Sequence, residues 1–160
     1  MDHNDNSQRQ AFIKSIKFLS YRARSKQEII NYLNKKGFPS ETINLTVKAL
    51  EEENLINDHK FAAEWIQLKA QQGYGSIKLR HQLKAKGVDD CIIEENLSQI
   101  LSEEEEYRLA EELLYKRKKR TENNHSTNRF WQKTANYLMS RGYPFSLVNK
   151  LIQDHRKDFL

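Results

Sequence analysis

Three glycines, at positions 37, 87 and 142, occupy matching places in three copies of one sequence pattern. A leucine stands four residues before each glycine, a basic residue stands directly before it, and an apolar residue follows it. A β-branched aliphatic residue lies six positions after each glycine and another aliphatic residue lies ten after, at repeat spacings of 50 and 55 residues. Repeats of this length are typical of proteins that stack one supersecondary unit several times.

The pattern around each glycine predicts two amphipathic helices joined by a tight turn. Glycine adopts the left-handed conformation that ends a helix, and a base beside it complements the negative helix end. Pro39 and Pro144 then stand where a new helix begins, a position that tolerates proline. Asp89 and Asp90 offer capping carboxylates at the matching place in the second copy.

A further helix is predicted before each pair, over residues 9–22, 58–72 and 103–121. The sequence therefore predicts an all-α chain of three tandem three-helix repeats that form an elongated, curved array. We place a disordered tail at 1–8 and the repeats at 9–56, 57–101 and 102–160, with a polar connection at 122–128. Only five glycines and two prolines occur, too few for the many turns of a β-sandwich.

The basic residues are unevenly distributed and favour a nucleic-acid or acidic partner. Lys and Arg number 27 against 22 Asp and Glu, which gives a net charge of +5. The run Lys116–Arg120 closes a segment that Glu103–Glu106 open, so it is either the basic end of a solvated helix or a phosphate contact. Lys78, Arg80, Lys84 and Lys86 occur within 75–88 with no acid among them, and we expect these charges to be uncompensated.

The residues of enzyme sites are not found in a recognisable arrangement, and we predict a protein that is not an enzyme and has no cofactor or metal. The five histidines form no HExxH motif. The single cysteine, Cys91, is expected to be a small buried residue rather than a nucleophile. Asp58 is expected to cap its own helix. The segment from Gly73 to Ser76 lacks the lysine of a phosphate-binding loop and is interpreted as a tight turn.

The candidate partner-binding residues form a surface rather than a catalytic site. Tyr74 lies in a predicted loop beside bases, where an aromatic ring either stacks on a nucleotide or anchors a protein. The remaining candidates are the bases next to the glycines and in the two clusters: Lys36, Lys78, Arg80, Lys84, Lys86, Arg117, Lys118, Lys119, Arg120 and Arg141. No apolar run is long enough to span a membrane, and the polar N-terminus favours a cytoplasmic location.

Several segments together resemble the RecX family of bacterial recombination regulators. They are Arg24-Ser25-Lys26-Gln27-Glu28-Ile29, Leu55-Ile56-Asn57-Asp58 followed by Phe61-Ala62, Gly73-Tyr74-Gly75-Ser76 before Leu83-Lys84-Ala85-Lys86-Gly87, and Leu138-Met139-Ser140-Arg141-Gly142-Tyr143. The resemblance covers roughly residues 9–155. Ser76 stands where a proline is common in the family, and Tyr143 stands where phenylalanine is common.

The resemblance implies a protein that binds the RecA filament on single-stranded DNA, lies in its groove, and inhibits ATP hydrolysis and strand exchange. It also implies a fold of tandem three-helix repeats and no catalysis by the chain itself. DNA contact is expected to be independent of sequence and salt-sensitive, and we expect a monomer. The basic clusters alone support an alternative, a general nucleic-acid-binding repeat protein without preference for the filament.

Overall fold

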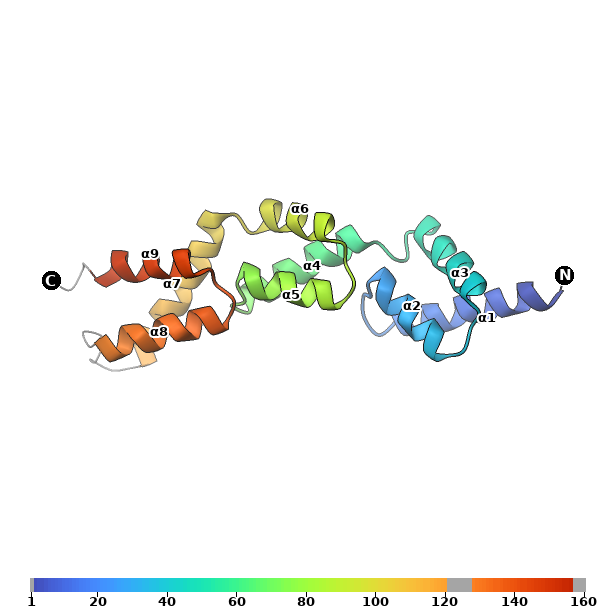
Figure 1. Cartoon of the computed structure of the whole chain (residues 1–160), viewed down its shortest axis with the longest axis horizontal. Helices are drawn as coiled ribbons and strands as arrows, with labels where there is room; N and C mark the ends of the chain where they lie inside the picture. Colours follow the sequence, from blue (N-terminus) through green and yellow to red (C-terminus); the bar gives the residue numbers. More distant parts are fainter. Residues whose placement is uncertain (1, 121–127, 157–160) are drawn as a thin grey trace. The chain divides into compact units, whose positions relative to one another are not determined.

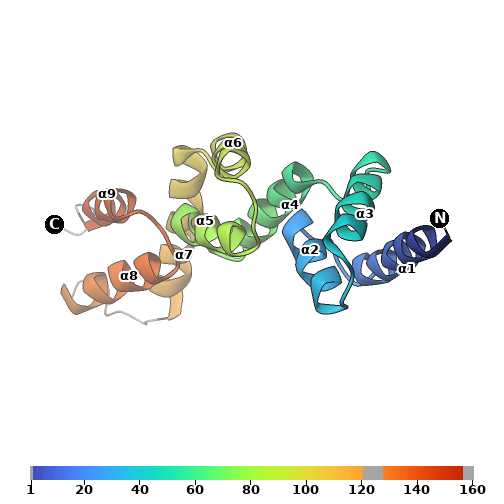
Figure 2. The same cartoon turned by 45° about the vertical axis from the view of Figure 1, so that its right-hand side comes forward.

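The computed structural model describes residues 2–120 and 128–156, which form nine helices and no strand (Figure 1). This confirms an all-α fold of three three-helix repeats. The helices are α1 (Asp2–Leu19), α2 (Lys26–Lys35), α3 (Ser40–Glu52), α4 (Asp58–Gln71), α5 (Ser76–Ala85), α6 (Asp90–Ile100), α7 (Glu103–Arg120), α8 (Asn128–Ser140) and α9 (Phe145–Arg156). Figures 1 and 2 show α2–α3 and α8–α9 as helix pairs joined by short turns.

The first helix differs from its predicted range, whereas α4 and α7 each end one residue before theirs. Helix α1 begins at Asp2, seven residues before the predicted start, and so occupies most of the segment expected to be a tail. No glycine or proline interrupts the chain before Gly37, and nothing local therefore stops the helix from extending toward the N-terminus. The predicted polar connection at 122–128 lies almost wholly outside the described residues.

The described chain divides into two compact units. Unit 1 is Met1–Ala62 with Leu83–Ile93, and unit 2 is Ala63–Gln82 with Glu94–Leu160. The residues of the second predicted repeat are thus distributed between the units, and each unit is described by itself. The predicted repeat limits at 56 and 101 stay predictions.

The core of unit 1 is built from the positions that repeat in the sequence. Leu33, four residues before Gly37, is fully buried, and the aliphatic residues at the sixth and tenth positions after that glycine, Ile43 and Val47, are buried in α3. Ala11 of α1 and Ile29 of α2 join the same cluster. The 3–4 spacing therefore places one apolar stripe of each helix in the core.

The core of unit 2 forms between α7, α8 and α9. Ala110 and Leu114 of α7 pack with Trp131 and Leu138 of α8 and with Leu151 of α9. Trp131 is buried. Leu151 of α9 is fully buried. Ile152, at the tenth position after Gly142, is only partly buried and packs against the cluster.

All three glycine turns have the predicted geometry. Gly37, Gly87 and Gly142 have φ values of 81°, 74° and 89°. In each turn the N–H of the residue after the glycine donates to the carbonyl of the leucine that precedes the glycine by four, and this bond marks the left-handed helix end.

In unit 1 the turn at Gly87 forms a joint with the start of α2. The Ser25 hydroxyl donates to the Lys86 carbonyl at 2.6 Å, and Ser25 also shares a reciprocal capping box with Glu28. The Lys86 Nζ lies 3.7 Å from the Glu28 carboxylate. A Cβ added at Gly87 would lie 2.4 Å from the Gln27 Cβ, so only glycine permits this approach.

In unit 2 the turn at Gly142 forms a corresponding joint with the start of α5. The Gly75 N–H donates to the Arg141 carbonyl at 2.9 Å, and the Ile77 N–H donates to the Gly142 carbonyl at 3.0 Å. A Cβ added at Gly142 would lie 2.4 Å from the Lys78 Cβ. The segment from Gly73 to Ser76 is therefore a tight turn that also joins two repeats.

The roles expected for Asp58 and Cys91 were wrong. Asn57 is the residue that caps α4, because its Oδ1 accepts from the Lys60 N–H at 3.0 Å. Asp58 instead accepts from the Lys26 N–H at 2.8 Å and so caps α2 across 32 positions of sequence. Cys91 is exposed, because it stands two residues before the buried Ile93 and about 200° away around α6.

Candidate phosphate-binding site

Unit 2 brings together five of the candidate residues from three separate parts of the sequence. Tyr74 and Lys78 come from the α4–α5 turn and the first turn of α5, whereas Arg117 and Arg120 come from the end of α7. Arg141 directly follows α8 and lies beside both groups. The joint at Gly142 therefore positions this set, because it fixes Arg141 against the start of α5.

A cavity of about 420 Å³ is lined by three of these residues, Arg117, Arg120 and Arg141. We name it the cationic pocket, and its lining consists of Leu113, Lys116, Arg117, Arg120, Tyr137 and Arg141. The four lining residues from α7 follow a spacing of three and four, so they lie on one face of the helix. Tyr137 and Arg141 stand four residues apart on the facing segment.

Aromatic and hydroxyl groups hold the guanidinium groups of the cationic pocket in place. The Arg117 guanidinium carbon lies 4.6 Å from the centre of the Tyr137 ring, and its Nε–H donates to the Thr134 hydroxyl at 3.4 Å. The Arg141 guanidinium lies 5.4 Å from the same ring. Guanidinium groups stack favourably on aromatic rings, so Tyr137 orders two of the four cations without neutralising them.

Tyr74 gathers a second set of cations around Arg141. Its ring centre lies 4.8 Å from the Lys78 Nζ, 5.0 Å from the Arg141 guanidinium and 5.9 Å from the Lys69 Nζ. Arg141 also donates to the Gln72 carbonyl at 3.3 Å. Arg141 thus lies between Tyr74 and Tyr137 and connects the two sets.

The electrostatics of the cationic pocket favour an anion. Its lining carries four cations and, among the residues that the structure describes, no carboxylate. Like charges held close together repel, and an anion that binds among them relieves this repulsion. Two of the four cations are the stacked guanidinium groups of Arg117 and Arg141, whose planar donor forks match phosphate oxygens. The pocket is therefore suited to a phosphate group.

Three of the four basic residues within 75–88 are paired with acids. The expectation that their charges are uncompensated was therefore wrong for these three. Arg80 pairs with Glu94 at 2.9 Å, Lys84 with Asp90 at 3.0 Å, and Lys86 with Glu28 at 3.7 Å. These acids come from outside the segment, and a count of charges within it misses them. Only Lys78 joins the cation set around Tyr74.

The other basic residues that were predicted to bind a partner lie apart from the cationic pocket. Lys36 is the exposed C-cap of α2, with its Nζ 5.6 Å from the centre of the Tyr32 ring. Lys118 lies over Trp131 at 5.2 Å, and Lys119 is exposed. Neither residue lines the pocket, because they occupy other faces of α7.

Tyr137 and Lys69 were not among the predicted site residues. A signal for Tyr137 was present, since it precedes Arg141 by four residues and so shares its side of the chain. Lys69 carried no such signal, because the α4–α5 turn decides its approach to Tyr74.

Two other features, a metal site and a membrane span, are absent from the described ranges. No group of three or more His, Cys, Asp or Glu side chains there is placed to hold a metal ion. None of the described helices is both long and apolar enough to cross a membrane.

Comparison with known proteins identifies the family. Sequence models of the first, second and third three-helix domains of RecX match residues 11–50, 57–97 and 103–152. The regulatory protein RecX of Haemophilus influenzae (strain PittGG) is 33% identical over 150 residues, which cover 93% of this chain and 97% of that protein. The chain belongs to the RecX family. The cationic pocket therefore lies in the third RecX domain.

Two further RecX relatives are longer than this chain. The Bacillus velezensis protein is 33% identical over 149 residues, covering 91% of this chain and 55% of its own length. The Geobacillus kaustophilus protein is 29% identical, with 91% and 54% covered. The chain thus spans about half the length of these curated relatives.

Two solved RecX structures have the same fold. A crystal structure of regulatory protein RecX superposes with a TM-score of 0.78 at 28% identity, covering 94% of this chain and 73% of the other. RecX from Lactobacillus salivarius gives a TM-score of 0.83 at 21% identity, with 94% and 97% covered. The second likeness concerns the fold alone.

Proposed function

We propose that this RecX protein regulates recombination by binding the RecA filament on single-stranded DNA, where it inhibits ATP hydrolysis and strand exchange. The observation that carries the proposal is the cationic pocket, which gathers four cations from α7 and the α8–α9 turn and suits the phosphates of a DNA strand. Membership of a family of regulatory proteins supports the RecA context. We further propose that the protein acts as a monomer in the cytoplasm.

The affinity for single-stranded DNA is expected to depend on the salt concentration. If the four cations of the pocket each neutralise one phosphate of a single strand, log K falls with log salt with a slope of about −3. Sequence independence follows as well, because phosphate contacts carry no information about the bases.

The cationic pocket also supports the second candidate, a nucleic-acid-binding repeat protein with no preference for the filament. Nothing in a phosphate site requires a recombinase, so this candidate predicts equal affinity for bare DNA and for the filament. A direct comparison of the two ligands therefore separates the candidates.

The test measures ATP hydrolysis by RecA on poly(dT) while the protein is added at ratios well below one per recombinase. We expect a steep fall in rate, because a few bound molecules disrupt a whole filament. A triple variant, Lys116→Gln, Arg117→Gln and Arg120→Gln, removes three pocket charges and leaves the joint at Arg141 in place. We expect it to inhibit at least tenfold more weakly and to reduce the salt slope by about 2.

A matched control removes three exposed charges of unit 1 through Lys14→Gln, Lys17→Gln and Lys35→Gln. The control is expected to inhibit like the unaltered protein. An unchanged ATPase rate at every ratio, together with retained binding to bare DNA, would transfer the assignment to the second candidate.

A further inference from the structure

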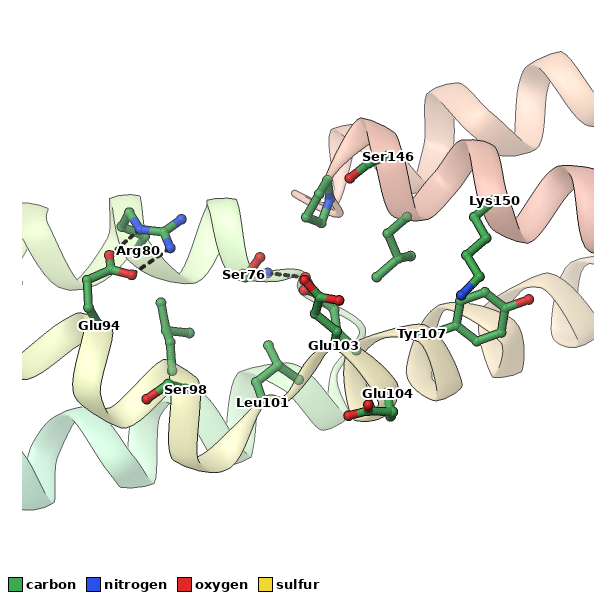
Figure 3. A pocket seen from close by; sticks show the side chains of 14 residues that line it. Ser76, Arg80, Glu94, Ser98, Leu101, Glu103, Glu104, Tyr107, Ser146 and Lys150 are labelled. Atoms are coloured by element: carbon green, nitrogen blue, oxygen red, sulfur yellow. Dashed lines mark hydrogen bonds and ion pairs between the residues drawn. The ribbon is translucent and has the colours of Figure 1, made fainter.

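Unit 2 contains a second and larger cavity whose chemistry is opposite to that of the cationic pocket. It has a volume of about 800 Å³ and is lined by residues of α5, α6, α7 and the start of α9 (Figure 3). Its apolar part is formed by Leu97, Leu101, Pro144 and Leu147, together with the ring of Tyr107. We name this cavity the acidic groove because of the charges described next.

Four glutamates and two cations line the acidic groove, and one of the two cations is paired with one of the glutamates. Arg80 pairs with Glu94, and the Lys150 Nζ lies 5.5 Å from the centre of the Tyr107 ring (Figure 3). The deepest carboxylate, Glu106, accepts from the Ser76 N–H at 2.6 Å. Glu103 and Glu104, in the first turn of α7, are both exposed along the groove. The acidic groove thus carries an excess of negative charge in a chain of positive net charge.

The chemistry of the acidic groove excludes two classes of ligand. A nucleic acid strand is disfavoured because its phosphates would meet carboxylates. A metal ion is disfavoured because, among the described residues, no three His, Cys, Asp or Glu side chains are placed to hold one. A ligand that suits both parts of the cavity has a positive charge for Glu103 and Glu104 and an apolar side chain for the leucines.

We propose that the acidic groove binds a segment of a partner protein that presents a lysine or arginine beside a large apolar side chain. The proposal rests on the proposed function in one respect, since the protein expected to supply the segment is the recombinase of the filament. A nucleoprotein filament offers both phosphates and polypeptide. Unit 2 has one cavity suited to each, so the cationic pocket takes the DNA and the acidic groove takes the protein.

The experiment compares two ligands: RecA filaments formed on fluorescein-labelled (dT)30 with a slowly hydrolysed ATP analogue, and the same oligonucleotide without RecA. One variant removes charge through Glu103→Gln and Glu104→Gln. A second, Ser146→Trp, fills the cavity from an exposed position in α9 without altering charge. The matched control is Glu52→Gln with Glu53→Gln, two exposed acids at the end of α3.

We expect both groove variants to bind the filament about tenfold more weakly, because each removes one of the two matched features of the interface. Affinity for the bare oligonucleotide is expected to stay the same or to rise slightly in the charge variant. The control should match the unaltered protein with both ligands. A photo-crosslinking residue at position 98, which also lines the groove, should attach to RecA peptides that contain a lysine or arginine next to a large apolar residue.

The possible failures are distinct. If the unaltered protein binds filament and bare oligonucleotide equally, the proposed function fails and the inference fails with it. If the unaltered protein prefers the filament and both groove variants keep full affinity, only the inference fails. Crosslinks from Ser98 to DNA would also overturn it. So would a dimer in sedimentation equilibrium that Ser146→Trp dissociates, because a second copy would then occupy the groove.

Discussion

Replacing Gly142 with alanine tests whether the glycine turns join repeats or merely end helices. A Cβ at position 142 would lie 2.4 Å from the Lys78 Cβ and 2.5 Å from the Lys78 backbone nitrogen. Gly37 provides the control, because its φ is similarly positive while a Cβ there would meet nothing within 4 Å. The two substitutions therefore share the backbone strain and differ in the clash.

The magnitude follows from these contacts. Left-handed backbone costs a residue with a Cβ about 1–2 kcal/mol, and Gly37→Ala should lower the free energy of unfolding by that amount. Gly142→Ala adds an overpacking cost of about 1–3 kcal/mol. It also strains the two hydrogen bonds that Arg141 and Gly142 accept across the joint, each worth about 0.5–1.5 kcal/mol. If both hydrogen bonds are lost, these costs sum to about 3–8 kcal/mol.

Urea denaturation followed by circular dichroism measures both variants against the unaltered protein. The affinity for single-stranded DNA provides a second readout, because a displaced turn moves Arg141 out of the cationic pocket, whereas Gly37→Ala leaves the pocket unaltered. The reasoning would be refuted if the two alanine variants lost equal stability, since the clash with Lys78 would then cost nothing.

Three further substitutions test individual groups in unit 2. Tyr143→Phe removes a hydroxyl that is buried without a hydrogen-bond partner among the described residues, and it should raise the free energy of unfolding by about 1 kcal/mol in urea; a loss would show that the hydroxyl is paired. Burial raises the pKa of Glu106 above its ordinary value near 4.5, so its contribution to stability is fully present below that value and is lost as pH rises through the raised pKa. Glu106→Gln keeps an acceptor for the Ser76 N–H and should remove this decline in a series of melting temperatures against pH; a series that still declines like that of the unaltered protein would assign the effect to another group. Lys78→Glu places a carboxylate beside Arg141 and should weaken binding to single-stranded DNA about tenfold while changing stability by less than about 1 kcal/mol, as fluorescence anisotropy and urea titration would show; unchanged affinity would exclude Lys78 from the site.

The glycine turns were predictable because their causes are local. Each needs a left-handed residue at the end of an apolar stripe, and both features lie within about ten residues of sequence. The leucines that precede the glycines, Leu33, Leu83 and Leu138, are all fully buried, as the repeat pattern indicates. The same locality explains why α7 could be placed to within one residue.

The contacts between repeats were not predictable, because their partners lie far apart in the chain. Ser25 reaches Lys86 across 61 positions, and Asp58 caps a helix that begins 32 positions earlier. Arg80 looked unpaired for the same reason, since its acid, Glu94, lies 14 residues away on another helix. A single sequence indicates that such a residue is polar but does not indicate its partner.

The cationic pocket was predictable in part. Arg117 and Arg120 were candidates together with Lys118 and Lys119, and helical periodicity separates these pairs because neighbouring residues lie about 100° apart around a helix. The position of Arg141 beside Tyr74 depends on the joint between repeats, which the sequence does not reveal. The sequence therefore predicts which basic residues are candidates, whereas only the fold shows that they line one pocket.

The two joints explain why the same repeat position has different roles. The base directly before the glycine is Lys86 in one copy and Arg141 in the next, and each meets the start of the helix contributed by the preceding repeat. Nine residues before its own glycine, that preceding repeat has Glu28 in the first case and Lys78 in the second. Glu28 pairs with Lys86, whereas Lys78 and Arg141 share the Tyr74 ring. Because one side chain changes from acid to base, one joint is neutralised and the other concentrates the positive charge that a phosphate site requires.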